Sequence, residues 1–161
     1  MDCFLDTGIL GLVTNPQANE EAEACNRWLE QLLRAGHRAC VAEICDYELR
    51  RELLRLEFKR ASGYEKWAAA RARLDALKNA LHYVPITTTA MLRAAELWAK
   101  ARNSGRPTAD DKALDADMIL TAQVLTFAAD NQASGRTLIA TTNVGHLSLF
   151  AEAHRWNEIT P

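Results

Sequence analysis

The chain has 161 residues, a formal net charge of -2, 48% hydrophobic residues and 25% charged residues. This size and composition are typical of one globular domain, so we expect a single domain over residues 1–161 and exclude a disordered chain or a uniformly basic nucleic-acid-binding module. No apolar run reaches the roughly 18 residues that span a bilayer. Asp2 and Asp6 also interrupt the apolar start, so the expected location is cytoplasmic, without a membrane partner.

The first half of the chain alternates short apolar runs with longer helical patterns. Cys3–Asp6 predicts a buried strand, and the Thr7-Gly8 turn after it precedes a short helix at Ile9–Val13. Apolar residues then recur at helical spacing in three longer segments, with further short apolar runs between or after them. The elements predicted there are a helix at 19–35, a strand at 38–42, helices at 43–60 and 64–81, and a strand at 83–86.

The second half continues the same alternation. A helix is predicted at 87–102, followed by a polar loop at 103–113. The next helix, Leu114–Ala128, is apolar on nearly all sides from Met118 onward, which indicates a buried central position. The remaining elements predicted are a strand at 137–141, a short helix at 147–151 and an edge strand at 155–159.

Short apolar strands that alternate with helices predict an α/β fold, with a parallel sheet covered on both faces. Ligands of such sheets bind outside the carboxyl ends of the strands. Asp6 ends the first predicted strand, Glu48 lies early in the helix after the second, and Asp117 lies near the start of the helix before the fourth. We therefore expect these three acids near one rim of the sheet.

The chemistry of this rim points to a hard cation. The chain has no G-x-G-x-x-G or G-x-x-x-x-G-K phosphate loop and no G-x-S-x-G elbow. Its four cysteines lack C-x-x-C spacing and its four histidines are far apart, so reduced, packed thiols are expected and a Cys/His zinc site is disfavoured. Mg²⁺ and Mn²⁺ prefer oxygen ligands, and either ion would relieve repulsion among bunched carboxylates.

Four segments, in order, resemble the motifs of PIN domains, in particular the VapC-type toxins. The first two are F-L-D-T-G-I-L at 4–10 and Y-E-L-R-R-E-L at 47–53. The other two are L-D-A-D-M-I-L-T-A-Q at 114–123 and T-T-N-V-G-H-L at 141–147. The resemblance spans almost the whole chain. It implies a PIN-like three-layer fold with a five-stranded parallel sheet of order 3-2-1-4-5 and a protruding helical hairpin.

The resemblance also implies a Mg²⁺- or Mn²⁺-dependent endoribonuclease that hydrolyses RNA with an activated water. Asp6, Glu48 and Asp117 would be its catalytic and metal-binding acids, with Asp115 as a further candidate. On a regular helix Asp115 and Asp117 point about 200° apart, so a helix N-cap is the other reading of Asp115. The implied accessory residues are Thr7, Thr141 and Asn143.

This chain departs from the family pattern at two of these positions. Asn143 stands where many PIN domains have an acid, which leaves open whether one or two metals bind. Gly8 stands where Asn is common.

Each acid also has a structural interpretation. Asp6 is a natural turn or cap residue after a strand. Glu48 has Arg51 at helical spacing, which favours a solvated ion pair. Asp117 is a first-turn acid that favours the helix dipole.

The net charge conceals an uneven distribution. Residues 50–78 hold nine basic and four acidic side chains, an excess of five positive charges, so the rest of the chain carries about -7. This basic arm can contact RNA phosphates, with Arg50, Arg51 and Arg55 as candidates, or can simply be a solvated surface. The family resemblance adds a third reading, a groove for an antitoxin protein, and an apolar stripe with Leu53 and Trp67 suits that contact or a homodimer.

Two other functions compete with the nuclease. The missing acid at Asn143 motivates a non-catalytic PIN-like module that binds RNA or protein. A receiver or haloacid-dehalogenase domain is the third reading, because Asp6 ends the first strand. Gly8 occupies the position where the dehalogenase pattern needs its second acid, which disfavours that reading.

Overall fold

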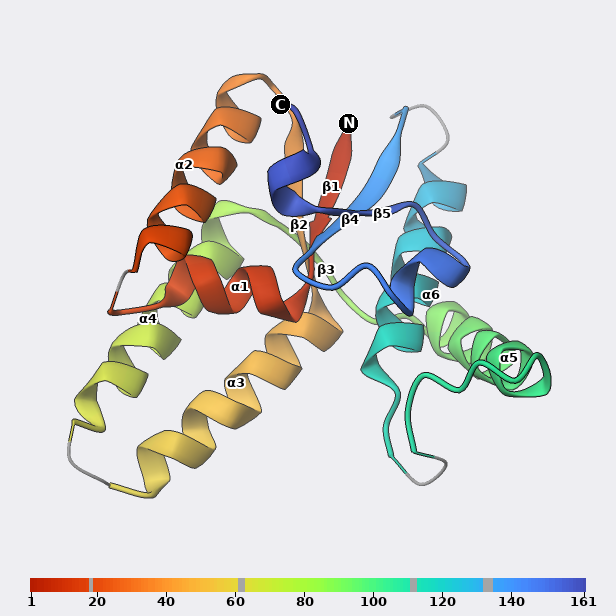
Figure 1. Cartoon of the computed structure of the whole chain (residues 1–161), viewed down its shortest axis with the longest axis horizontal. Coiled ribbons are helices and arrows are strands. Elements are labelled where there is room, and N and C mark those ends of the chain that lie inside the picture. The colour runs from red at the N-terminus through yellow and green to blue at the C-terminus, as the bar shows by residue number, and fades with distance from the viewer. Residues whose placement is uncertain (18, 61–62, 111–112, 132–134) are drawn as a thin grey trace.

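The computed structural model describes residues 1–17, 19–60, 63–110, 113–131 and 135–161. Its centre is a parallel sheet of five strands in the order β3-β2-β1-β4-β5, as predicted (Figure 1). The strands are β1 (Asp2–Leu5), β2 (Arg38–Ala42), β3 (His82–Val84), β4 (Thr137–Thr141) and β5 (Ala153–Arg155). The order reverses between β1 and β4, so this sheet has its topological switch point there.

Helices cover both faces of the sheet and make the three predicted layers. Figure 1 shows α1–α4 on one face and α5 and α6 on the other, which is the arrangement that right-handed crossovers require. The bounds are α1 (Thr7–Thr14), α2 (Glu20–Arg34), α3 (Glu43–Phe58), α4 (Glu65–Ala80), α5 (Thr88–Asn103) and α6 (Ala116–Asp130), with 3₁₀ turns η2 (Leu147–Leu149) and η3 (Trp156–Glu158).

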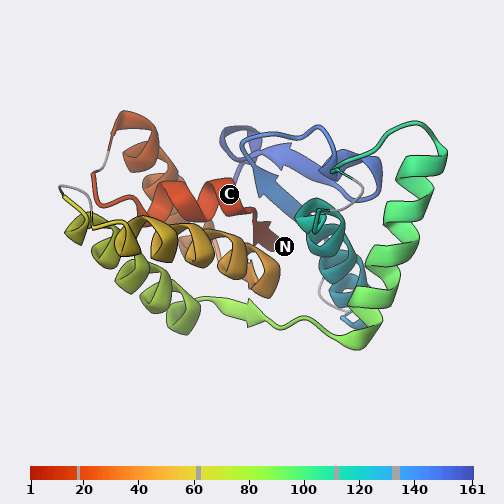
Figure 2. The same ribbon diagram turned by 90° about the horizontal axis from the view of Figure 1, so that it is seen from below.

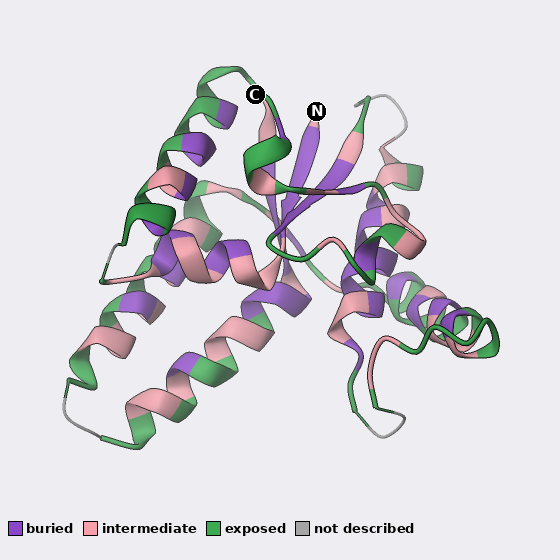
Figure 3. Cartoon of the chain, in the orientation of Figure 1, coloured by how far each residue is buried: buried purple, intermediate pink, exposed green. Residues whose placement is uncertain are grey.

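Burial explains why the central strands are apolar on both sides. Every residue of β1 and four of the five in β4 are buried, and so is most of α6 (Figure 3). The rings of Phe4 and Phe127 pack edge to face across this core at 5.2 Å. The four cysteines are all free and buried, as predicted, and burial raises the pKa of Cys3, Cys25 and Cys40 to about 12.

The α3–α4 hairpin extends beyond the sheet, as Figure 2 shows from below. Its two helices pack along their length, and Arg50 of α3 joins them through an ion pair of 2.8 Å to Asp75 of α4. Arg71 of α4 and Glu57 of α3 form a second bridge at 3.1 Å. Two arginines of the basic arm, Arg50 and Arg71, are therefore paired with acids within the hairpin and stabilise the contact between its helices.

The last strand is the main correction to the predicted elements. The prediction of a strand at 155–159 is wrong, because β5 is Ala153–Arg155 and residues 156–158 form a 3₁₀ turn. The apolar residues of that segment pack against α2 instead of pairing in the sheet. Trp28 Nε1 donates a hydrogen bond to the Ile159 carbonyl at 3.0 Å, and the rings of Trp28 and Trp156 lie 5.9 Å apart.

Smaller shifts occur at other boundaries. β3 ends at Val84 because Pro85, which follows, has no N–H to donate. Helix α1 begins at Thr7, two residues before the predicted start, because Asp6 caps it. Residues 111–112 of the predicted polar loop lie outside the described residues. No helix in the described ranges combines the length and apolarity needed to cross a bilayer.

Candidate acidic active site

Asp6 lies at the switch point of the sheet, where β1 ends and α1 begins. It is the N-cap of α1, and one carboxylate oxygen accepts a hydrogen bond from the Thr7 N–H at 2.6 Å. The other oxygen accepts from the Thr141 hydroxyl at 2.7 Å, which comes from the end of the neighbouring β4. Burial raises the pKa of Asp6, although these two donors act in the opposite direction.

Thr141 connects Asp6 to the segment after β4. Its hydroxyl oxygen also lies 3.0 Å from the Asn143 N–H, which donates to it, and 3.2 Å from the Asn143 carbonyl. The Asn143 side chain is exposed and its Oδ1 accepts from the Gly145 N–H at 3.3 Å. The structure therefore brings the predicted accessory residues Thr141 and Asn143 to the rim beside Asp6, with Asn143 engaged in its own turn.

Glu48 reaches the same rim from α3. One of its carboxylate oxygens accepts from the Thr7 hydroxyl at 2.8 Å, so Thr7 bonds Glu48 through its side chain and Asp6 through its backbone. Arg51 lies 3.7 Å from the other oxygen, a loose pair between partly exposed side chains. The ion pair expected between Glu48 and Arg51 thus exists, but the shorter contact joins Glu48 to the site.

Gly8 makes room for this arrangement. A Cβ at position 8 would lie 2.7 Å from the hydroxyl oxygen of Thr142, closer than ordinary contacts allow. The segment after β4 therefore packs directly on the first turn of α1. Thr142 therefore occupies the space that a side chain at position 8 would need, and Gly8 leaves that space free.

Asp117 comes to the site from the first turn of α6. Its pKa is raised first by burial and then by the negative charge of Asp6. His146 Nδ1 lies 3.3 Å from Asp117 Oδ2, and this contact partly offsets the rise. The sequence reasoning did not assign His146 to the site, although its place three residues after Asn143 in the fourth motif was a usable signal.

Asp115 is the N-cap of α6. Its Oδ1 accepts from the Met118 N–H at 3.1 Å, its Oδ2 accepts from the Thr108 hydroxyl, and only 7% of the residue is exposed. These bonds fix the start of α6 and hence the position of Asp117, which follows two residues later in the first turn. A metal-ligand role for Asp115 remains a prediction.

The three candidate RNA-binding arginines differ in their ion pairs and in the exposure of their side chains. Arg50 binds both Asp46 and Asp75 at 2.8 Å and is 27% exposed, so its charge is used inside the hairpin. Arg55 pairs with Glu52 on the surface of α3. Arg51 is 54% exposed and is the one of the three that lies next to Glu48.

The residues present fit a divalent cation. Within the described ranges no three His, Cys, Asp or Glu side chains converge closely enough to form a ready cation cage. Mg²⁺ does not need such a cage, because it keeps several waters and binds through one or two carboxylates together with substrate phosphates. Asp6 and Asp117 supply two carboxylates of raised pKa, and neither forms an ion pair with Lys or Arg in the described part of the chain.

The fold and the site together define a parallel α/β domain with unneutralised carboxylates at its switch point. The chain belongs to the PIN domain family, whose model matches residues 3–143. No curated protein sequence matches it.

Solved structures with the same fold extend over almost the whole chain. The chain is similar to a component of VapBC2 from Rickettsia felis bound to a DNA fragment from its promoter, with 15% identity, a TM-score of 0.67 and coverage of 97% of this chain and 99% of that one. FitAcB from Neisseria gonorrhoeae is similar with 17% identity, a TM-score of 0.67 and coverage of 98% of this chain and 99% of that one. DNA-bound VapBC from Salmonella typhimurium is similar with 16% identity, a TM-score of 0.62 and coverage of 97% of this chain and 98% of that one. At these identities the likeness establishes the fold.

Proposed function

We propose that this PIN domain is a Mg²⁺- or Mn²⁺-dependent endoribonuclease and the toxin of a toxin–antitoxin pair. The observation that carries the proposal is the position of Asp6 and Asp117 at the amino ends of α1 and α6, where neither forms an ion pair with a Lys or Arg of the described residues. Two such carboxylates are costly to keep unless a cation compensates them.

The side chains of the site have distinct tasks in this proposal. Asp6 and Asp117 bind the cation, and Glu48 completes the acidic set while holding Thr7 against Asp6. Thr141 keeps the Asp6 carboxylate in place, and Asp115 fixes the helix end from which Asp117 projects. His146 positions the Asp117 carboxylate. A divalent cation held there would supply positive charge for the phosphodiester and would lower the pKa of an attacking water.

The charge distribution supports RNA as the substrate. The hairpin at 50–78 carries an excess of five positive charges in a chain whose total is -2. It begins beside Glu48, and the exposed guanidinium of Arg51 lies 3.7 Å from that acid. Lys and Arg placed in this way attract phosphates in a salt-dependent manner.

An apolar cavity beside the α3–α4 hairpin supports a protein partner. A cavity of about 390 Å³ lies between α1, α3 and α4, with Leu49, Leu53, Leu56 and Trp67 among its lining residues. This is the apolar stripe that the sequence assigned to an antitoxin or a dimer contact. We propose that an antitoxin segment binds there, in line with the VapBC and FitAcB assemblies that share the fold. A homodimer and a cytoplasmic location, where RNA is available, complete the proposal.

The test is RNA cleavage by the purified chain. We expect cleavage with Mg²⁺ or Mn²⁺, none in excess EDTA, and loss of cleavage in Asp6→Asn. Single-stranded DNA of the same sequence serves as the control substrate. Cleavage that survives Asp6→Asn or EDTA would contradict the proposal, and so would equal cleavage of the DNA.

The non-catalytic module remains the second candidate, because Asn143 is neutral and exposed at the rim. It predicts RNA binding without cleavage under every metal condition. A wild-type chain that binds RNA but does not cut it, while retaining its fold by circular dichroism, would establish that alternative.

A further inference from the structure

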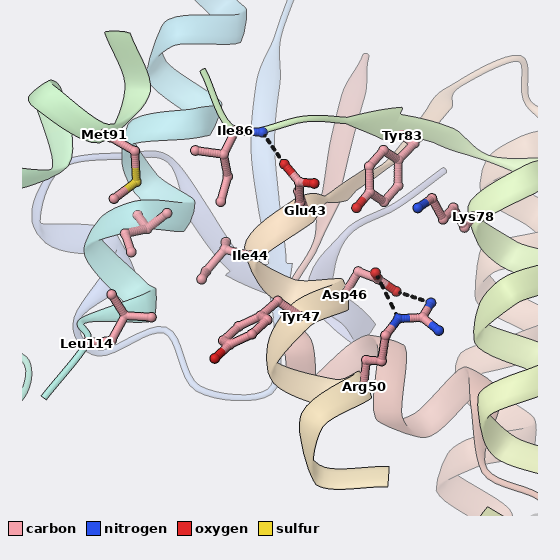
Figure 4. Close-up of a pocket in the computed structure, with 11 residues that line it drawn as sticks. Glu43, Ile44, Asp46, Tyr47, Arg50, Lys78, Tyr83, Ile86, Met91 and Leu114 are labelled. Atoms are coloured by element: carbon pink, nitrogen blue, oxygen red, sulfur yellow. Dashed lines mark hydrogen bonds and ion pairs between the residues drawn. The ribbon is translucent and has the colours of Figure 1, made fainter. Parts of the chain in front are cut away.

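A pocket that the acidic site does not use lies on the other side of the first turns of α3. It has a volume of about 390 Å³ and is lined from α3, α4, β3, α5 and α6 and their connections (Figure 4). Pockets of this size, apolar with a few polar groups, are the usual sites of small organic ligands or ligand fragments.

Residues that line the pocket are neighbours in sequence of residues of the acidic site. Tyr47 lines the pocket and directly precedes Glu48, and Leu114 lines it and directly precedes Asp115. Arg51 joins the two sites, because its guanidinium lies 5.4 Å from the centre of the Tyr47 ring and 3.7 Å from Glu48. An RNA strand whose phosphate lies at the acids would therefore have a neighbouring nucleotide within reach of the pocket.

Figure 4 shows that the lining is divided. Apolar side chains of Ile44, Ile86, Met91 and Leu114 lie on one side, and the Tyr47 ring points toward them. Tyr47, Met91 and Leu114 are 49%, 41% and 55% exposed, so this apolar side is open to a ligand.

The other side of the pocket is polar and its charged groups are mostly paired. Glu43 accepts a hydrogen bond from the Ile86 N–H at 2.7 Å, and Arg50 binds Asp46 (Figure 4). Lys78 lies 4.4 Å from the centre of the Tyr83 ring. Burial raises the pKa of Tyr83 to about 12, so its hydroxyl stays protonated and able to donate.

The chemistry of the lining favours a nucleobase over a second copy of the chain. Two aromatic rings of one pocket, Tyr47 and Tyr83, each have a cation beside their ring. Aromatic rings that stack on bases, next to Lys and Arg that contact the backbone, are what single-stranded nucleic acid uses. The pocket also opens beside the hairpin that carries the excess positive charge of the chain.

We propose that this pocket receives one unstacked base of the RNA strand, which stacks on the Tyr47 ring while its neighbouring phosphate lies toward the acidic site. The inference rests on the proposed ribonuclease function and adds a base-binding subsite to it. Tyr47 would then contribute to the choice of cleavage site.

The test measures RNA binding in EDTA, so that it does not depend on cleavage. The probes are a short fluorescein-labelled single-stranded RNA and an abasic oligomer with the same ribose-phosphate backbone, compared by fluorescence anisotropy. We expect the wild-type chain to bind the RNA roughly 10-fold or more tightly than the abasic oligomer, as one stacked base provides. Tyr47→Leu should abolish this difference and Tyr47→Phe should keep it. Tyr64→Leu, the same change at an exposed ring on the hairpin tip, should keep it too.

Three results would overturn the inference. One is a wild-type chain that binds both probes equally, and another is a Tyr47→Leu variant that still discriminates between them. The third is a loss of discrimination in Tyr47→Leu that accompanies dissociation of a dimer in sedimentation, which would assign the pocket to a second copy. Failure of the proposed ribonuclease appears separately, as absence of cleavage when Mn²⁺ is added to the same samples.

Discussion

The two ends of strand β1 carry aspartates with opposite environments. Asp2, at the amino end, is 4% exposed in its side chain and is bound by the Arg38 guanidinium at 2.6 Å. Asp6, four positions later at the carboxyl end, is held by the Thr141 hydroxyl and the Thr7 N–H, which are uncharged donors. Asp2 is therefore paired with an arginine, whereas Asp6 is held by uncharged donors.

The same difference recurs between two acids on the helices. Asp46 follows the pattern of Asp2, because Arg50 binds it. Asp117 follows the pattern of Asp6, because its near partner is a histidine and its pKa is raised by burial and then by the charge of Asp6. In the proposed function, the carboxylates without an arginine partner are the ones that would hold a divalent cation.

The largest expected effect is on activity at the unneutralised end. Asp117→Asn should lower the rate of Mn²⁺-dependent RNA cleavage on the order of 10³-fold, because cation binding supplies several kcal/mol of transition-state stabilisation. Asp130→Asn, the same change at the far end of α6, should leave the rate within about 2-fold. Equal rates for Asp117→Asn and the wild type would remove Asp117 from the site.

The next effect is on stability at the neutralised end. Asp2→Asn leaves Arg38 without its charged partner and should lower the free energy of unfolding by about 2 kcal/mol, less than a fully buried pair would cost because Arg38 is partly exposed. Urea denaturation measures this change. RNA cleavage by the folded variant should stay near the wild-type rate, and a large loss of cleavage would mean that the two ends of β1 are not independent.

A smaller effect concerns pH and stability without metal. The pKa of Asp6 is raised by folding, so the folded state takes up this proton more readily than the unfolded chain, and ionised Asp6 lowers stability above its raised pKa. Asp6→Asn removes that cost and should raise the thermal midpoint at neutral pH in EDTA. The gain should shrink as the pH falls through the folded pKa of Asp6 toward the ordinary aspartate range. A variant less stable than the wild type at neutral pH would contradict this reading.

The smallest effect expected is at Asn143. Asn143→Asp adds a negative charge at an exposed position that Thr141 connects to Asp6, and such a charge is worth on the order of 1 kcal/mol in water. Mn²⁺ affinity should rise by roughly 5-fold. Asn157→Asp on η3 is the matched control and should leave the affinity unchanged. Equal gains in both variants would indicate a general charge effect.

Local apolar patterns predict most of the individual strands, whereas the order of the sheet follows from the resemblance to PIN domains. The apolar runs at 38–42 and 137–141 can only be buried strands, and they are. The segment at 155–159 also contains apolar residues and is expected to be a strand. Trp156 and Ile159 instead contact Trp28 of α2, and a local sequence pattern does not reveal such a long-range contact.

The site is less accessible to sequence reasoning than the fold. Asp6 was identifiable from its place after a strand, whereas Glu48 could not be chosen over Glu43 or Glu52 without the PIN resemblance. The structure shows why: all three acids form hydrogen bonds, and Glu48 differs in accepting its bond from Thr7, a residue far away in sequence that lies beside Asp6. The contact between His146 and Asp117 joins positions 29 apart along the chain, so periodicity carries no sign of it.

Calorimetric titration with Mn²⁺ tests the contrast between the two ends of β1 most directly. The wild-type chain and Asp2→Asn should both bind the ion, while Asp6→Asn and Asp117→Asn should each lose binding. Binding of Mn²⁺ that persists unchanged in Asp6→Asn and Asp117→Asn, or a wild-type chain that binds none, would contradict the account.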